Sequence, residues 1–374
     1  MSLLSSINSG CLLHRGGEAE LYRVESGSGK KLTLKLYKDG LEYDARVIES
    51  LQKLSLPGIY HIVESGHVDG RAYVLYDFID GVCSRDLSPL PLELALFYLR
   101  KLVVSLKELL QRGVSHGDIC PDNVFFDRDA SPVLIDFGIC GPGMLMFSAP
   151  ERIEGNSPTE KSDLFSLGAL FYYWLTGESL FDGKDFEEIR EKIANVDKVN
   201  PGMLLFEKAS LGLKPETLSV LEPLWKGLLA TNPESRLEGL DELDELLEIA
   251  LDSLGGPGVH FACETDQLRE KISRILTKNE TKTPETVDFS FFEPSNGTKI
   301  PSRKYLWVTV LFIFLITVAL VAFFAKGDEA SSVDVIGEQL LQKSRSHEME
   351  SLTDSIKMPD LEGVLEKIAP EENK

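Results

Sequence analysis

Basic residues are scarce in this chain relative to acidic ones. The 374 residues include 39 Lys and Arg against 60 Asp and Glu, so the net charge is 39 − 60 = −21 at neutral pH. Nucleic-acid binding requires clustered basic side chains that contact phosphates, so this acidic surplus argues against a nucleic-acid partner. Apolar residues make up 43% of the chain, which excludes disorder along its whole length.

Cysteines are also few, and their spacing does not suit a common metal site or a set of disulfides. No two of them form a CxxC pair, which disfavours a zinc site and a disulfide framework and indicates a reducing, cytosolic setting. The first residues, 1–15, lack the basic start and the apolar run of a secretory signal. We therefore expect the N-terminal part to stay in the cytoplasm.

One long apolar run lies near the C-terminus. Residues 305–325 read YLWVTVLFIFLITVALVAFFA and carry no charge. About 20 such residues span a bilayer as a helix, and a helix buried in a soluble domain is the less favoured alternative. Lys299, Arg303 and Lys304 precede the run, whereas Lys326 alone follows it closely, so the positive-inside rule places the N-terminal part in the cytoplasm.

The composition divides the chain into four parts. Residues 1–252 are long enough for a two-lobed domain with its own core. Residues 253–304 contain Gly, Pro and charged stretches and predict a cytoplasmic juxtamembrane linker, with one short amphipathic helix around Leu268 that packs on a partner or on its own domain. Residues 305–325 are the expected transmembrane helix, and residues 326–374 are a short acidic extracytoplasmic tail.

The N-terminal part predicts β-hairpins with a glycine-containing turn. Residues 12–24 read LLHRGGEAELYRV, and the turn ESGSGK and the segment KLTLKLYK follow. Alternating apolar residues on either side of a Gly/Ser turn are typical of paired strands. Gly16 and Gly17 allow close approach to a ligand, and Lys35 can neutralise phosphate. Alone, this pattern also fits many hairpins that bind nothing.

A second cluster of motifs lies further along the chain and helps to interpret these strands. Residues 116–127 read HGDICPDNVFFD, and the segments PVLIDFGIC and SAPER follow. In order and spacing these motifs resemble the protein kinase family, and the resemblance extends over about Leu12–Ala250. The later segments KSDLFSLGALFYYWLTG and TNPESRL continue it. They count against a small-molecule phosphotransferase, whose catalytic loop also often begins with HGD.

The resemblance implies an α+β, two-lobed protein kinase-like fold, with a β-rich N-lobe and a helical C-lobe, followed by the single transmembrane helix. It implies ATP and Mg²⁺ as cofactors. Asp118 would be the catalytic base, and Lys35 would clamp the α- and β-phosphates. Asn123 and Asp136 would hold the metal, because Mg²⁺ prefers oxygen ligands.

The same resemblance assigns further residues to the nucleotide. They would cover the phosphates from the glycine-containing turn, contact adenine from the hinge at residues 77–79, or hold the phosphates and metal. The expected cofactor-binding residues are Leu13, Gly16, Gly17, Ala19, Lys35, Asp77, Ile79, Asn123 and Asp136. In the C-lobe, Arg236 of TNPESRL would pair with Glu151 of SAPER as a structural anchor.

The chain departs from the family pattern in its N-lobe. His14 stands at the first glycine of the turn and Ala19 at the third, so the turn fits the pattern less closely. The acid that would pair with Lys35 is not evident. Asp44 is favoured because apolar residues follow it at helical spacing, and Glu49 is the alternative.

The C-lobe also departs from the pattern around the activation segment. Gly117 stands where the family's HRD motif carries Arg. The segment 136–151 is short and carries Met144 and Met146 where a phosphorylatable Thr is expected. Family members without that Arg usually do not depend on activation-loop phosphorylation, so we predict an activity that loop phosphate does not switch.

The most serious departure is Cys120, which stands where serine/threonine kinases carry a Lys that contacts the γ-phosphate. Loss of one charge-assisted hydrogen bond of about 1.5–3 kcal/mol slows transfer roughly 10- to 150-fold without abolishing it. Cys120 and Cys140 both lie near the expected site. They are either a redox switch or two ordinary small residues, and the second alternative is favoured.

We therefore expect a membrane-anchored, ATP- and Mg²⁺-dependent protein serine/threonine kinase, similar in arrangement to bacterial kinases of the plasma membrane with a cytoplasmic catalytic domain. The alternative is a pseudokinase that binds nucleotide or a partner as a membrane-tethered scaffold, which Cys120 and the short activation segment favour. The expected partners are protein substrates, which can include the chain itself, and the membrane. A homodimer is left open.

Overall fold

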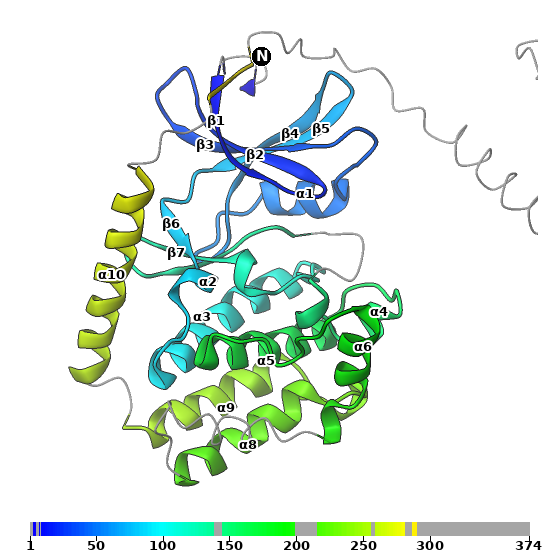
Figure 1. The fold of residues 1–374 in the computed structure, drawn as a ribbon, viewed down its shortest axis with the longest axis vertical. Coiled ribbons are helices and arrows are strands. Elements are labelled where there is room, and N and C mark those ends of the chain that lie inside the picture. Colours follow the sequence, from blue (N-terminus) through cyan, green and yellow to red (C-terminus); the bar gives the residue numbers. More distant parts are fainter. Residues whose placement is uncertain are drawn as a thin grey trace, which may run out of the picture. The chain divides into compact units, whose positions relative to one another are not determined.

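The computed structural model describes residues 3–4, 7, 9–137, 144–198, 215–255, 259–280 and 286–289. The described residues all fall within one unit of the chain, residues 1–296. They form a β-rich N-lobe and a helical C-lobe, as predicted (Figure 1).

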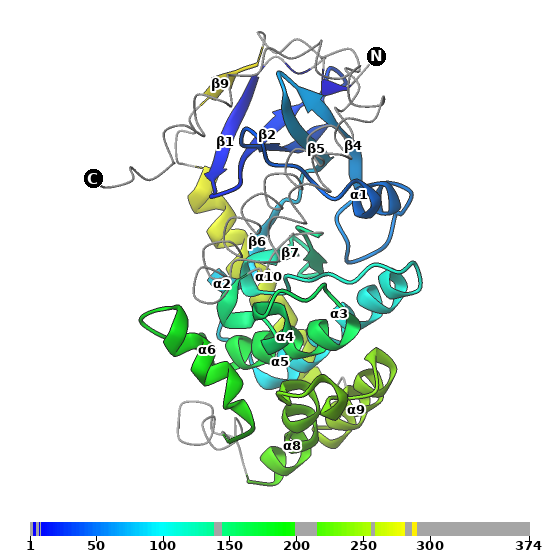
Figure 2. The same cartoon turned by 90° about the vertical axis from the view of Figure 1, so that its right-hand side faces the viewer.

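The N-lobe is built on a six-stranded antiparallel sheet with strand order β4-β5-β3-β2-β1-β9 (Figure 2). The turn between β1 and β2 is the predicted glycine-containing turn. Side chains alternate between the faces of β3, so Leu34 and Leu36 enter one core cluster while Tyr37 enters the other. The strands are β1 (Ser9–Arg15), β2 (Ala19–Glu25), β3 (Lys31–Tyr37), β4 (Ile62–Val68), β5 (Arg71–Asp77) and β9 (Thr286–Asp288).

A short helix, α1 (Ala45–Gln52), accompanies this sheet and contacts β4. Asp44 is its N-cap, and the Asp44 carboxylate accepts hydrogen bonds from the N–H groups of Arg46 and Val47, which satisfies two of the free donors of the first turn. Its buried residues, Ile48 and Leu51, are three positions apart and lie on one face.

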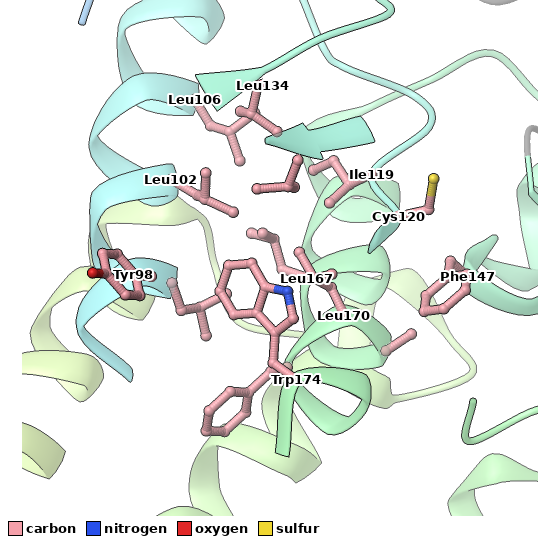
Figure 3. Packing of buried hydrophobic residues seen from close by; sticks show 14 of the residues in the cluster. Tyr98, Leu102, Leu106, Ile119, Cys120, Leu134, Phe147, Leu167, Leu170 and Trp174 are labelled. Atoms are coloured by element: carbon pink, nitrogen blue, oxygen red, sulfur yellow. The ribbon is translucent and has the colours of Figure 1, made fainter. Parts of the chain in front are cut away.

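The C-lobe packs around α5 (Glu160–Thr176), which is buried on all sides from Ser162 to Leu175. A capping box between Thr159 and Ser162 starts this helix, and Gly177 ends it with a left-handed backbone, φ 74°. Figure 3 shows the indole of Trp174 among leucines of α3 and α5. The other helices are α2 (Ser84–Leu87), α3 (Leu92–Leu110), α4 (Pro150–Ile153), α6 (Phe186–Ala194), α8 (Pro215–Leu229) and α9 (Leu240–Ser253).

A small antiparallel sheet with strand order β6-β7-β8 carries the central motifs. The residues of the HGDICPDN segment lead into β7 through a short 3-10 turn, and the IDFG segment follows β8. Pairing of β7 with β8 therefore brings the two motifs together. The strands are β6 (Gly81–Cys83), β7 (Val124–Asp127) and β8 (Pro132–Leu134); the 3-10 turns are Pro121–Asn123, Leu145–Phe147, Val196–Lys198 and Pro233–Ser235.

The structure differs from the expected linker at residues 253–304. Helix α10 (Val259–Glu280) contacts β6, α2 and α3, and its Leu268 and Ile272 are buried. The Lys271 ammonium donates to the carbonyl of Leu87 at 2.7 Å. The predicted amphipathic helix is thus packed on its own domain, because residues four apart form one apolar stripe.

Strand β9 follows α10 and joins the N-lobe sheet at the edge of β1, with Gly10 opposite Val287. Next to it, the buried ring of Phe289 meets the ring of Tyr22 edge-on, with 5.0 Å between centroids. A side chain at Gly10 would collide with Phe289, since a Cβ there would lie 2.6 Å from its ring. The folded domain therefore extends beyond the predicted boundary at Asp252.

Within the described ranges, no helix has the length and apolar character needed to cross a bilayer. The predicted transmembrane segment 305–325, the tail 326–374 and Cys140 lie outside the described residues.

Candidate functional site

The Lys35 side chain lies at the junction of the two lobes. Its Nζ forms an ion pair with Oδ1 of Asp136, a contact that links β3 to the IDFG segment. The Lys35 side chain is 11% exposed and that of Asp136 is 31% exposed, so the pair is only partly screened by solvent. Burial acts to lower the pKa of Lys35, but the charge of Asp136 overcomes this effect, and the pKa is raised.

Asp136 adopts an unusual backbone conformation, with φ 65°. Such a conformation is uncommon for residues other than glycine and persists where the surroundings hold it. The ring of the next residue, Phe137, lies 4.3 Å from that of His116 and 5.6 Å from that of Tyr60. Packing of Phe137 between the lobes therefore fixes the turn that aims Asp136 at Lys35.

Asp118, the predicted base, is held by donors on both carboxylate oxygens. Its Oδ1 accepts from the backbone N–H of Met144 at 2.8 Å, and its Oδ2 accepts from Nδ2 of Asn123 at 2.7 Å. Burial raises the pKa of Asp118 to about 6, against the lowering effect of the Met144 hydrogen bond. A carboxyl group with this pKa is suited to accept a proton near neutral pH.

Helix α5 holds the loop that carries Asp118 in place through the side chain of Asp163. The carboxylate of Asp163 accepts from the N–H of His116 at 2.8 Å and from that of Gly117 at 2.9 Å. Gly117 has φ 81°, and a side chain there would also collide with Pro158, since a Cβ would lie 2.7 Å from its ring. The glycine in the HGD sequence therefore fits this local geometry.

His116 fixes the loop through both ring nitrogens. Its Nδ1 accepts from the N–H of Asp118 at 3.2 Å, and its Nε2 lies 3.1 Å from the carbonyl of Ile135. Burial lowers the pKa of His116 to about 4, so the ring is neutral and its Nε2–H donates to Ile135. The histidine thus joins the Asp118 loop to the strand that precedes Asp136.

Cys120 lies in the C-lobe core, 1% exposed, among the residues shown in Figure 3. Burial raises the pKa of its thiol well above the ordinary value, so the thiolate that redox chemistry needs is disfavoured. Its side chain therefore serves packing, which supports the ordinary alternative to a redox switch.

The glycine-containing turn is present where predicted. The N–H of Gly16 donates to the carbonyl of Ala19 at 2.9 Å, and a Cβ at Gly16 would lie only 3.1 Å from that oxygen. Gly17 has no atom within 4 Å of its Cβ position. A β-bulge between Leu12 and His14 leaves the side chain of Leu13 49% exposed. Their contacts with nucleotide stay predictions.

The hinge residues Asp77 and Ile79 follow the central strands. The Asp77 side chain faces Lys30, with 2.5 Å between Oδ1 and Nζ, and His61, with 3.5 Å between Oδ2 and Nδ1. Ile79 directly follows Phe78, whose backbone N–H donates to the carbonyl of Lys31 at 3.4 Å. The contacts of Asp77 and Ile79 with adenine stay predictions.

The prediction that Asp44 pairs with Lys35 was wrong. Its carboxylate caps α1 by accepting from the N–H of Arg46 at 2.9 Å. Glu49, the alternative, is exposed and makes no ion pair with Lys35 among the described residues. The cause is that Asp44 is the N-cap residue of α1, so its carboxylate faces the free N–H groups of the first turn.

Sequence analysis missed two features of the site. The Lys35 ammonium lies 5.1 Å from the centroid of the Tyr37 ring, a contact that the same-face spacing of alternate strand residues could have indicated. Arg85 of α2 pairs with Asp122 of the catalytic loop, at 2.5 Å from Nε to Oδ1 and 2.6 Å from Nη2 to Oδ2. No local pattern reveals the second pair, because the two residues are far apart in sequence.

The donor set fits a Mg²⁺–nucleotide complex. Since Nδ2 of Asn123 is bound to Asp118, its carbonyl oxygen remains for a cation, and Asp136 adds carboxylate oxygen. Among the described residues, no group of three or more His, Cys, Asp or Glu could hold a metal ion by itself. Mg²⁺ at one or two protein oxygens, with the rest from phosphates and water, is compatible with that finding.

Comparison with known proteins accounts for this arrangement. A family model described as protein kinase domain matches residues 15–248. The chain belongs to the protein kinase domain family. It is 23% identical over 296 residues to the probable serine/threonine-protein kinase PknB of Lactococcus lactis, covering 72% of this chain and 46% of that protein. It is 27% identical over 221 residues to the serine/threonine-protein kinase PknE of Mycobacterium tuberculosis, covering 51% and 39%. These matches span less than half the length of either relative.

Solved structures share the kinase fold. The kinase domain of Mycobacterium tuberculosis PknI superposes with a TM-score of 0.52 at 22% identity, covering 64% of this chain and 94% of that one. Rad53 (residues 1–466), solved in complex with AMP-PNP, superposes with a TM-score of 0.53 at 22% identity, covering 62% of each chain. The predicted resemblance to the protein kinase family and the two-lobed fold are thus confirmed.

Proposed function

We propose that this kinase-family chain is an ATP- and Mg²⁺-dependent protein serine/threonine kinase. The observation that carries the proposal is that Lys35 contacts Asp136 and that Asp118 contacts Asn123. The charges of Asp136 and Lys35 both act on the pKa of Asp118, so the two pairs form one electrostatic unit.

Each side chain has a role in transfer. Lys35 would hold the α- and β-phosphates, and Asn123 and Asp136 would hold Mg²⁺, which neutralises phosphate charge. ATP supplies the γ-phosphoryl group as substrate. The substrate hydroxyl oxygen would bond to the γ-phosphorus as the bond to the β,γ-bridging oxygen breaks, and Asp118 would accept the hydroxyl proton.

The test is Mg²⁺-dependent transfer of labelled γ-phosphate by the purified full chain, to itself and to generic protein substrates. Asp118→Asn is the matched control, because it keeps the size and one acceptor oxygen but cannot accept the proton. We expect transfer by the wild type and only a small residual rate in the variant. A folded, ATP-binding chain that transfers no phosphate would contradict the proposal.

A pseudokinase scaffold is the second candidate. It is favoured by the burial of Cys120 in the core, where the family's Lys would point a charge at the γ-phosphate. If one charge-assisted hydrogen bond is lost, transfer slows roughly 10- to 150-fold. ATP binding with no transfer even at high enzyme concentration would support the scaffold.

Attachment to a membrane through residues 305–325 is a further part of the proposal, and it rests on the uncharged run and the basic residues before it. Protease treatment of intact and of opened bacterial spheroplasts expressing the full chain tests it. We expect the kinase domain to be digested only after opening. Recovery of the full chain in the high-speed supernatant would contradict the attachment.

A further inference from the structure

Lys35 forms an ion pair with Asp136 across the lobe junction, but α1 supplies no acidic partner for it. Its ammonium contacts Asp136, and in the described part of the chain no acidic side chain of α1 reaches it. In active protein kinases this lysine pairs with a glutamate of that helix. The question is therefore what holds the ammonium from the side of α1.

The aromatic ring of Tyr37 lies on that side. Its centroid is 5.1 Å from Nζ of Lys35, within the range of a cation–π contact. The two residues alternate along β3 and so lie on the same face of the sheet. Counted as whole residues, Lys35 is 9% exposed and Tyr37 is 8% exposed, so water screens the contact little.

The Tyr37 ring is itself fixed by its surroundings. Its backbone carbonyl accepts from Nε of Arg71 at 2.7 Å, and its ring lies 6.2 Å from that of Tyr43, the residue before the cap of α1. Across the strand pair it stands opposite the small Ala19. The tyrosine therefore occupies the space between β3 and the start of α1.

We propose that Tyr37 is the positioning residue for Lys35, in the place that an acid of α1 fills in the family pattern. Burial acts to lower the pKa of Lys35, and Asp136 and Tyr37 act to raise it, Tyr37 through its phenolic oxygen. The hydroxyl of Tyr37 therefore stabilises the ammonium in addition to the ring face. Because Tyr37 belongs to the same strand as Lys35, the lysine keeps its support whatever the position of α1. The inference rests on the proposed binding of ATP.

The experiment measures the affinity of the full chain for ATP with Mg²⁺ by calorimetry. We expect Tyr37→Leu to weaken binding about tenfold, since it removes both the ring and the hydroxyl beside a desolvated ammonium. Tyr37→Phe loses only the hydroxyl and keeps the ring, so it should weaken binding less than Tyr37→Leu. Glu49→Gln, on the exposed face of α1, is expected to leave affinity unchanged.

A double-mutant cycle separates positioning from packing. In a Lys35→Met background, Tyr37→Leu should have no further effect on affinity, because there is no ammonium left to hold. If Tyr37→Leu does not fold, phenylalanines with increasing ring fluorination at position 37 replace it; they keep the shape and weaken the face of the ring, so affinity should fall stepwise.

Three results would overturn the inference: unchanged affinity when the ring is removed or fluorinated, an additive effect in the Lys35→Met background, or no ATP binding by the wild type. The proposed kinase activity fails differently. A chain that shows the Tyr37 effect on binding but transfers no phosphate refutes the activity alone, and a chain that transfers phosphate with no Tyr37 effect refutes this inference alone.

Discussion

The guanidinium of Arg236 binds the carboxylate of Glu151 through two hydrogen bonds, of 2.6 Å from Nη1 to Oε1 and 2.8 Å from Nη2 to Oε2. The Arg236 side chain is fully buried. The guanidinium also donates to the backbone carbonyls of Ala230, Lys161 and Thr231. The predicted pairing is confirmed, and it joins α4, at the end of the activation segment, to the turn before α9.

Arg236→Ala should destabilise the domain by about 3–5 kcal/mol, because it leaves the Glu151 carboxylate without its partner in a largely buried place. Urea unfolding of the full chain measures the change. Arg190→Ala, which removes an exposed pair with Glu187, is the control and should change stability by less than about 1 kcal/mol. Equal effects of the two variants would contradict a structural role for the buried pair.

Phosphate transfer should depend on pH through Asp118. Burial raises its pKa to about 6, so the carboxyl is protonated below pH 6 and cannot accept the hydroxyl proton. The rate constant for transfer at saturating ATP should rise with pH and level off above about 6. The residual rate of Asp118→Asn should lack this step, and a step of equal size in that variant would assign the titration to another group.

The raised pKa of Asp118 also affects the stability of the fold, and its effect on stability with pH is opposite to its effect on the transfer rate. Since the folded-state pKa of Asp118 lies above its ordinary value of 3.8, folding favours the protonated form. The stability that this group contributes is present at low pH and is lost as pH rises through about 6.

Phe289→Ala should weaken the N-lobe, because the ring is 3% exposed and packs edge-on against Tyr22. Removing a buried phenylalanine ring typically costs about 3–5 kcal/mol. Phe186→Ala, at a residue that is 49% exposed, is the matched control. Hydrogen exchange of the β1 amides measures the loss, and unchanged protection in Phe289→Ala would show that β9 does not support β1.

Activation by loop phosphate is not expected. Between Ile139 and Ser148 the only hydroxyl-bearing residue is Ser148 itself. It is 5% exposed, and its Oγ lies 3.1 Å from the carbonyl of Met144, so a phosphate there would disturb a packed turn. Phosphopeptide mapping of the active chain should find no modification in this stretch, and an activating phosphate there would refute the prediction.

The motifs predicted the lobes and the central site because their chemistry is local. Asp118 lies just before the 3-10 turn Pro121–Asn123, and Asp136 follows β8, which pairs with β7. The resemblance to the protein kinase family implied their roles and also the Arg236–Glu151 pair. These features were predictable because each belongs to a short motif that the family shares.

What failed depended on contacts between distant segments. Asp44 carries the right charge and helical spacing to pair with Lys35, yet it is also a favourable N-cap residue, and capping prevails. The composition of residues 253–304 indicated a linker because α10 is charged on its outer face. Only the fold shows that its inner face and Phe289 are buried.

The polypeptide joins the two lobes at two places. One is the hinge after β5, and the other is the passage from α10, which lies on the C-lobe, to β9, which pairs with β1. The segment that sequence composition alone assigns to a spacer thus supplies a packed helix to one lobe and an edge strand to the other.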